Sequence, residues 1–255
     1  MGLLTIIVAA LLPAGVMLLY INWKDKEHPE PRKWIWKGFL YGVISAFAST
    51  LISSPLGVLG FYTTGTAETV GEALKVAFFG AAIPEEAAKL FMLWLLLRKN
   101  PYFDEKVDGV VYAACVGMGF AAIENVEYLL MSYQNWMSVG LMRALISIPG
   151  HFMFAIAMGY YYSLGYWGKS RRDMALAFLA PMFLHGVFDG LLMMADTVPS
   201  GIATLLMFAF FWFFFKMRKR ASDKINTLLA DNDQYMGLFR ISRDPIPPSD
   251  NIDEQ

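Results

Sequence analysis

The sequence has little charge and almost no cysteine. Asp, Glu, Lys and Arg make up only 17% of its 255 residues and the net charge is -1, so the composition gives no support for nucleic-acid binding. Cys115 is the single cysteine, which excludes an intrachain disulfide and a Cys-based zinc site. The His-Glu-x-x-His signature is missing, as are Gly-x-Ser-x-Gly around Ser147 and Gly-x-Gly-Asp around Asp108 or Asp189.

Long apolar runs take the place of charge. The chain is 56% hydrophobic and 15% aromatic, and its mean hydropathy is +0.44. Each run is close to the ~20 residues that a helix needs to cross a bilayer. The sequence therefore predicts an all-α fold, a polytopic membrane helix bundle of about seven transmembrane helices. The runs cover residues 3–21, 36–54, 74–97, 108–131, 142–165, 174–194 and 199–215.

Basic residues gather in alternate connections between these runs. No Lys or Arg precedes the first run. The connections after the second, fourth and sixth runs contain few basic residues, only Lys75 and Arg143 at the edges of the third and fifth runs. The positive-inside rule then predicts a retained first helix with its N-terminus outside, and a cytoplasmic C-terminus. The segments rich in basic residues are 22–37 with five Lys or Arg, 98–107 with three, 166–173 with three and 216–224 with five.

The chain changes character after the last run. An aromatic stretch, residues 208–215, leads into Lys216-Met-Arg-Lys-Arg, which predicts an aromatic belt and a basic anchor at the cytoplasmic face. Residues 221–255 are polar and contain three prolines. We therefore predict a transmembrane domain over residues 1–220 and a cytoplasmic polar tail over residues 221–255, which starts as a short helix and is partly disordered.

Ionisable residues interrupt the third run. Glu85, Glu86 and Lys89 lie in an otherwise apolar stretch, and each such group near the bilayer centre costs ~2.5–3.5 kcal/mol, which indicates a function. Lys89 follows the two acids by four and three residues, on one face of a helix, so it can neutralise one carboxylate. The other carboxylate is then free to act as a base. We take Glu86 as the base, with Glu85 and Lys89 as the groups that tune it.

Acidic and imidazole groups of other runs reach a similar depth. In the predicted topology Glu124 lies ~10 Å below the outer end of its helix, His151 and His185 lie ~13 Å below, and the paired acids of the third run ~17 Å. A lone Glu or His in a helix bundle is often a packing hydrogen bond, but this set predicts a site in the outer half of the bilayer. The helices that supply it lie within residues 74–194. His28, in a basic loop, is most simply a solvated side chain.

Prolines and glycines accompany these residues. Pro84, Pro149 and Pro181 each precede a motif, and a proline within a helix frees the carbonyl four residues earlier, which opens a polar cavity. Gly117 and Gly119 in the fourth run permit close helix approach. The freed carbonyls belong to Gly80, Leu145 and Ala177.

Carboxylates and imidazoles at one level suit hydrolysis. A carboxylate can deprotonate water while a histidine or a metal ion stabilises the oxyanion. Glu124, His151 and His185 could equally bind a catalytic zinc ion, which would give a three-ligand site with an open position. Asp189 follows His185 by four residues and can fix its tautomer, or it can pair with Lys89 instead. The residues leave the metal-free and zinc mechanisms open.

Four short motifs occur in order between residues 80 and 192. They are Glu85-Glu86-Ala-Ala-Lys89, Phe120-x-x-x-Glu124-Asn125, Pro149-Gly-His151 and His185-Gly-Val-Phe-Asp189. Together they resemble the PrsW family of intramembrane proteases, which is distantly similar to the prenyl-protein (CAAX) endopeptidases and the bacteriocin-immunity membrane proteases. The resemblance marks as catalytic candidates Glu85, Glu86, Glu124, His151 and His185, with Lys89, Asn125 and Asp189 as supporting residues.

The resemblance also implies a substrate. It implies site-1 cleavage of a single-pass anti-sigma factor near the outer face of a bacterial cell membrane, with release of a sigma factor after further proteolysis. The prenyl-protease branch would have His in place of Glu124 and Asn in place of Asp189, which argues against a prenylated substrate.

Two other classes of function remain open from the residues alone. The intramembrane Glu and His set would also serve a proton- or ion-coupled transporter, although no internal repeat is visible. A non-catalytic scaffold could bind partner helices through the small faces at Gly117 and Gly119.

Overall fold

The fold is a bundle of long helices. The computed structural model describes residues 2–26 and 29–242, with the side chains of 232–242 left aside; His28 and the last part of the predicted tail, residues 243–255, lie outside it. Every regular element in the described residues is helical. Six helical stretches are long and apolar enough to cross a membrane. They are Leu3–Lys24, Arg32–Val58, Lys106–Met131, Tyr133–Trp167, Arg171–Ala195 and Ser200–Asp231.

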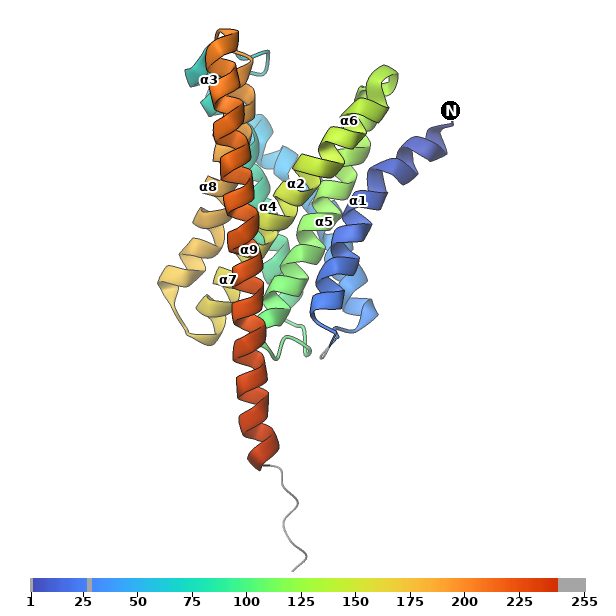
Figure 1. Ribbon diagram of the computed structural model, residues 1–255, viewed down its shortest axis with the longest axis vertical. Helices are drawn as coiled ribbons and strands as arrows, with labels where there is room; N and C mark the ends of the chain where they lie inside the picture. The colour runs from blue at the N-terminus through green and yellow to red at the C-terminus, as the bar shows by residue number, and fades with distance from the viewer. Residues whose placement is uncertain (1, 27–28, 243–255) are drawn as a thin grey trace, which may run out of the picture.

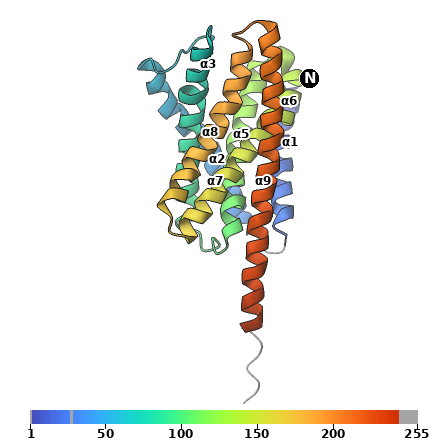
Figure 2. The same ribbon diagram turned by 60° about the vertical axis from the view of Figure 1, so that its left-hand side comes forward.

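Helix α5 (Lys106–Met131) is the centre of the bundle (Figure 1). It packs against α1 (Leu3–Lys24), α2 (Arg32–Val58) and α7 (Ile148–Trp167), and most of its residues are buried. Helix α8 (Arg171–Ala195) packs on α7, and α9 (Ser200–Ser242) lies across both of them (Figure 2). The seven-helix prediction for an all-α bundle is confirmed.

The third predicted helix is built from three continuous segments. These are α3 (Val70–Lys75), the π-helical η1 (Val76–Ala82) and α4 (Ile83–Leu97). The fifth is built in the same way from α6 (Trp136–Met142), the π-helical η3 (Arg143–Ser147) and α7.

Both π-helical segments end just before a proline. The backbone N–H of Ile83 donates to the oxygen of Phe78 and that of Ile148 to Arg143, which is the wider i to i−5 spacing. Because Pro84 and Pro149 have no N–H to donate and their rings crowd the preceding turn, the helix widens there. The predicted openings at Gly80 and Leu145 fall inside these segments. Pro181 differs, since α8 continues through it as an α-helix.

Glycines set the distance between α2 and α5. A Cβ on Gly42 would collide with the backbone oxygen of Val116, and a Cβ on Gly119 with that of Phe39. Gly117 has a similar role toward α7, where an added Cβ would meet the Cβ of Ala155 at 2.6 Å. The prediction that these two glycines of α5 permit close approach is confirmed.

Helix α9 is longer than the apolar run that predicts it. It runs unbroken from Ser200 to Ser242 and so continues through residue 220 into the predicted tail. Its basic residues also lie closer to the middle of the bundle than the sequence predicted. Lys216 and Arg220 line a pocket with Met153 of α7 and Phe183 of α8, beside the middles of these helices rather than beyond their ends.

We expect Gly119→Ala to destabilise the bundle, because the added methyl group must push α2 away from α5. Overpacking of this kind costs about 1–3 kcal/mol. Thermal unfolding in detergent would measure it. Gly15→Ala is the control, because nothing lies within 4 Å of the Cβ position at Gly15. Equal melting temperatures for Gly119→Ala and the wild type would refute this packing.

Candidate functional site

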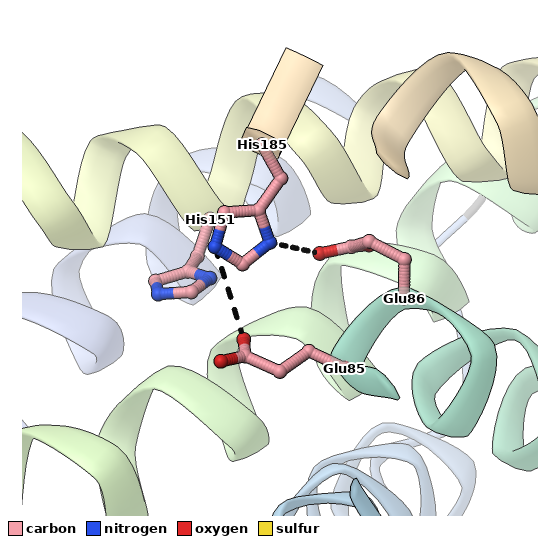
Figure 3. Close-up of side chains that lie close together, drawn as sticks. All are labelled: Glu85, Glu86, His151 and His185. Atoms are coloured by element: carbon pink, nitrogen blue, oxygen red, sulfur yellow. Dashed lines mark hydrogen bonds and ion pairs between the residues drawn. The ribbon is translucent and has the colours of Figure 1, made fainter. Parts of the chain in front are cut away.

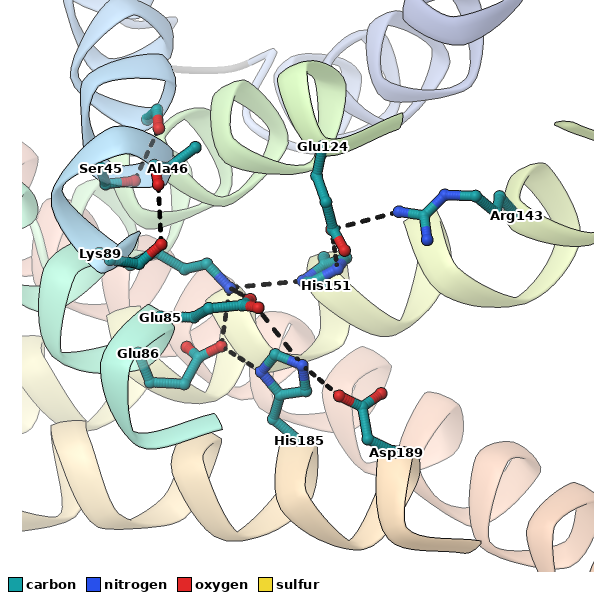
Figure 4. A network of polar contacts seen from close by, with 12 residues as sticks. Ser45, Ala46, Glu85, Glu86, Lys89, Glu124, Arg143, His151, His185 and Asp189 are labelled. Atoms are coloured by element: carbon teal, nitrogen blue, oxygen red, sulfur yellow. Dashed lines mark hydrogen bonds and ion pairs between the residues drawn. The ribbon is translucent and has the colours of Figure 1, made fainter. Parts of the chain in front are cut away.

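Polar side chains from four helical stretches meet inside the bundle (Figure 4). The structure brings together all five residues predicted as catalytic and all three predicted as supporting. It also brings in Arg143, which was noted in the sequence only as a lone basic residue at the edge of the fifth run. The residues are Glu85, Glu86 and Lys89 on α4, Glu124 and Asn125 on α5, Arg143 on η3, His151 on α7, and His185 and Asp189 on α8.

The ammonium group of Lys89 is the hub of this cluster. Its Nζ lies 2.8 Å from Oε1 of Glu86, 3.3 Å from Oε2 of Glu85 and 3.3 Å from Nδ1 of His151. The same Nζ is 3.9 Å from the centre of the Phe120 ring, a cation–π contact. Lys89 contacts both acids, whereas the sequence predicted that it would neutralise one and leave the other free; Glu86 is the closer partner.

These contacts fix the tautomer of His151. An ammonium group can only donate, so Nδ1 of His151 must accept from Lys89. The ring proton then sits on Nε2, which lies 2.8 Å from Oε2 of Glu124 and donates to it. His151 is therefore held between a cation on one side and a carboxylate on the other.

His185 lies between carboxylates on both sides. Its Nδ1 is 2.9 Å from Oε1 of Glu86 and its Nε2 is 3.2 Å from Oδ2 of Asp189. Oε2 of Glu85 is farther from Nε2, at 3.9 Å. Asp189 orients the ring of His185 as the sequence predicted, rather than pairing with Lys89.

Arg143 contacts Glu124 at the same oxygen atom as His151 does. Its Nη2 lies 3.2 Å from Oε2 of Glu124, and its Nε donates to Oδ1 of Asn125 at 2.8 Å. Asn125 in turn donates from Nδ2 to the backbone oxygen of Ala10, and the guanidinium lies 4.0 Å from the ring centre of Tyr128. Asn125 thus supports Arg143. The signal in the sequence that could have indicated the role of Arg143 is its position at the edge of an apolar run, shortly before Pro149.

Burial separates the carboxylates into two kinds. The side chain of Glu86 is 0% exposed, whereas those of Glu85, Glu124 and Asp189 are 15%, 18% and 20% exposed. The last three are therefore partly exposed, while Glu86 is sealed between Lys89 and His185. Only an accessible carboxylate can take a proton from a water molecule without a large rearrangement.

Four of the residues form a group that could hold a metal ion (Figure 3). Glu85, Glu86, His151 and His185 each offer one ligand atom, and these atoms lie within 4.8 Å of one another. Oε2 of Glu86 is buried without a hydrogen-bond partner in the described part of the chain, so it is available as a ligand. The ligand set proposed from the sequence differs, because it had Glu124 in place of the two acids of α4.

The charges of the cluster also fit a divalent cation. With both histidines neutral, its four carboxylates outnumber its two permanent cations by two negative charges. Buried charge of this kind requires compensation, and a divalent ion supplies exactly that amount or a protonated His185 supplies half of it. The donor set of two imidazoles and two carboxylates is one that zinc accepts.

Comparison with known proteins identifies the family of this chain. Residues 30–216 match the model described as "PrsW family intramembrane metalloprotease". Protease PrsW of Geobacillus kaustophilus (strain HTA426) is 33% identical over 219 residues, which are 85% of this chain and 92% of that protein. Protease PrsW of Clostridioides difficile (strain 630) is 36% identical over 195 residues, or 74% and 80% of the two chains.

The chain belongs to the PrsW family. Protease PrsW of Bacillus subtilis (strain 168) is 28% identical over 217 residues, 84% of this chain and 93% of that protein. No solved structure matches the chain. As a PrsW-family member it is an intramembrane protease and a multi-pass membrane protein, which decides against the transporter and scaffold alternatives. The family description as a metalloprotease agrees with the Glu and His group of this structure.

We expect Arg143→Gln to destabilise the protein, because it leaves Glu124 with one partner fewer in a largely buried setting. Removing one partner of a buried ion pair costs about 3–5 kcal/mol, and Arg143→Lys should lose less because it keeps the charge. Thermal unfolding in detergent would measure both variants. Arg98→Gln, at an exposed position, is the control. An Arg143→Gln protein as stable as the control would mean that Arg143 does not hold the site.

Proposed function

We propose that this protease cuts a single-pass membrane protein at a peptide bond near the outer face of a bacterial cell membrane. The depth of the site supports this. By the helix rise of 1.5 Å per residue, Glu124 lies ~10 Å from one end of α5 and ~27 Å from the end at Lys106. Likewise His185 lies ~15 Å from the end of α8 at Ala195 and ~21 Å from Arg171. The site is therefore nearer to the ends that lack basic connections, which the positive-inside rule assigns to the outside.

The observation that carries the catalytic proposal is the convergence of Glu85, Glu86, His151 and His185 from three helical stretches onto one point. Within this group we assign Glu85 as the general base. The sequence favoured Glu86, but Glu86 is fully buried and is held by Lys89 and His185, whereas Glu85 is partly exposed and makes the longer contact to Lys89. Because the base should be the carboxylate that is less tightly held, we assign this role to Glu85.

In this proposal Glu85 takes a proton from a water molecule as the water oxygen adds to the scissile carbonyl carbon. The negative charge that develops on the carbonyl oxygen is stabilised by the positive side of the cluster, Lys89 and His185. When the C–N bond breaks, the protonated Glu85 gives its proton to the leaving amine. Glu86 keeps Lys89 and His185 in place, and Glu124 with Arg143 keeps His151 in place.

A divalent ion, which we propose to be zinc, would be held by His151, His185 and Glu86, which leaves Glu85 free to act as the base. When bound, it would acidify water and polarise the carbonyl group. Lys89 lies 2.8 Å from Oε1 of Glu86 and 3.3 Å from Nδ1 of His151, whereas Oε2 of Glu86 has no partner in the described part of the chain. Glu86 could therefore offer Oε2 to an ion and keep its contact with Lys89, but Nδ1 of His151 would be free for the ion only if Lys89 moved aside.

For the substrate we propose an anti-sigma factor, cut at site 1 so that a sigma factor is released after further proteolysis. The family resemblance supports this, together with the position of the site toward the outer side. A single-pass protein can present an extended segment just outside its transmembrane helix, which a site at this depth can reach.

We expect Glu85→Gln to abolish cleavage of a candidate single-pass anti-sigma factor in proteoliposomes while leaving the melting temperature close to that of the wild type. Glu86→Gln should lower both, because it breaks the buried contacts to Lys89 and His185. Glu127→Gln, exposed on α5 near Glu124, is the control. Product masses and melting temperatures would be recorded for all four proteins.

Wild-type turnover by the Glu85→Gln protein would contradict its assignment as the base. The substrate proposal is tested separately with the wild-type protein. If it cuts other single-pass proteins but leaves anti-sigma factors intact, the catalytic assignment holds and the substrate assignment is wrong.

A further inference from the structure

Helix α9 carries three cations on one face. Lys216, Arg220 and Lys224 are spaced four residues apart, which places them in a row along the helix. All three line one pocket, whereas the neighbouring Arg218 and Lys219 do not. The row is therefore a feature of the interface between α9 and the bundle, not of the general basicity of this stretch.

The row extends well into the bundle. Asp231 of α9 lies 3.6 Å from Lys106, the first residue of α5, which marks the level of the basic connections. By the helix rise, Lys224 lies ~10 Å from this level toward the bundle centre, Arg220 ~16 Å and Lys216 ~22 Å. Cations at such depths are costly unless they have a partner or reach back toward the surface.

No carboxylate within the described side chains forms an ion pair with any of the three cations. The two lysines contact aromatic rings instead. The Nζ of Lys224 lies 3.5 Å from the ring centre of Tyr160 and 4.4 Å from that of Tyr161, and Nζ of Lys216 lies 4.5 Å from that of Trp212. The rings hold these two side chains in position, but they do not neutralise the positive charges of the row.

The pocket beside the row has apolar walls. Its volume is about 220 Å³, and it lies between α7, α8 and α9. The side chains around it are exposed on the outside of the bundle, such as Phe183, which is 58% exposed. Besides the three cations, the lining includes Met153, Ala157, Phe183, Leu184, Phe213 and Met217.

We propose that this pocket binds an anionic phospholipid. The phosphate lies on Arg220 and Lys224, with Lys216 deeper, and an acyl chain lies along the apolar wall formed by α7 and α8. A basic pocket between transmembrane helices recognises anionic headgroups in this way, and the apolar wall favours a lipid over a free phosphate. The bound lipid braces α9 against α8, the helix that carries His185 and Asp189.

The test uses the full chain purified in detergent and exchanged into defined lipid. Phosphatidylglycerol and phosphatidylcholine with identical acyl chains are titrated, and bound lipid is counted by native mass spectrometry. We expect selective, saturable binding of phosphatidylglycerol. A matched pair of double variants follows: Arg220→Gln with Lys224→Gln, and Arg218→Gln with Lys219→Gln. Both remove two charges from the same helix.

The first pair should weaken phosphatidylglycerol binding by about 25-fold, since each cation near the membrane contributes about fivefold to anionic-lipid attraction. The second pair should leave it close to that of the wild type. Equal losses in the two pairs would overturn the proposal, because they would show a diffuse charge effect.

Two further results would also overturn it. The first is equal binding of phosphatidylcholine, which would mean that the pocket takes lipid without regard to charge. The second is displacement of phosphatidylglycerol by millimolar inorganic phosphate, which would identify a soluble-anion site.

Discussion

The buried ammonium of Lys89 is the interaction on which the site depends. It lies among two carboxylates of its own helix and an imidazole of α7, at a depth where an isolated charge is costly. Through Glu86 it constrains His185 on α8, and through His151 it constrains Glu124 on α5. Without this one positive charge the cluster would carry a larger excess of negative charge, which would destabilise the packing of these helices.

The backbone provides the space for this network. The π-helical segments before Pro84 and Pro149 widen two helices immediately before the turns that carry Glu85 and His151. The close contact of α2 with α5 at Gly119 lies next to Phe120, whose ring faces Lys89. The two widened helices and the tightly packed α5 together direct polar side chains toward the same point, so local sequence, helix packing and chemistry are linked in this site.

Much of this could be predicted from the sequence because the information is local or periodic. The spacing of Lys89 from the two acids, and of Asp189 from His185, fixes a contact within one helix. The alternation of basic connections fixes which helix ends lie together, and so brings Glu124, His151 and His185 to a common depth. The four motifs meet in the structure, as the sequence predicted.

The parts that escaped prediction depend on how helices are rotated and shifted against one another. Adjacent residues such as Glu85 and Glu86 differ by about 100° around a helix, and only packing decides which one is sealed. Arg143 gains its role from Asn125 and from a carbonyl of α1, contacts that no spacing within one segment encodes. The longitudinal position of α9 against α7 and α8 is likewise set by packing, so its basic run lies deeper than its place in the sequence indicated.

The central claim is that Glu85, Glu86, His151 and His185 form one centre that holds a divalent ion for peptide hydrolysis. The most direct measurement is elemental analysis of the purified protein together with cleavage before and after chelation. The account predicts one bound divalent ion per chain, its loss in a His151→Ala, His185→Ala variant, and cleavage that stops in chelator and returns with zinc. Full cleavage by protein shown to be free of metal would contradict it.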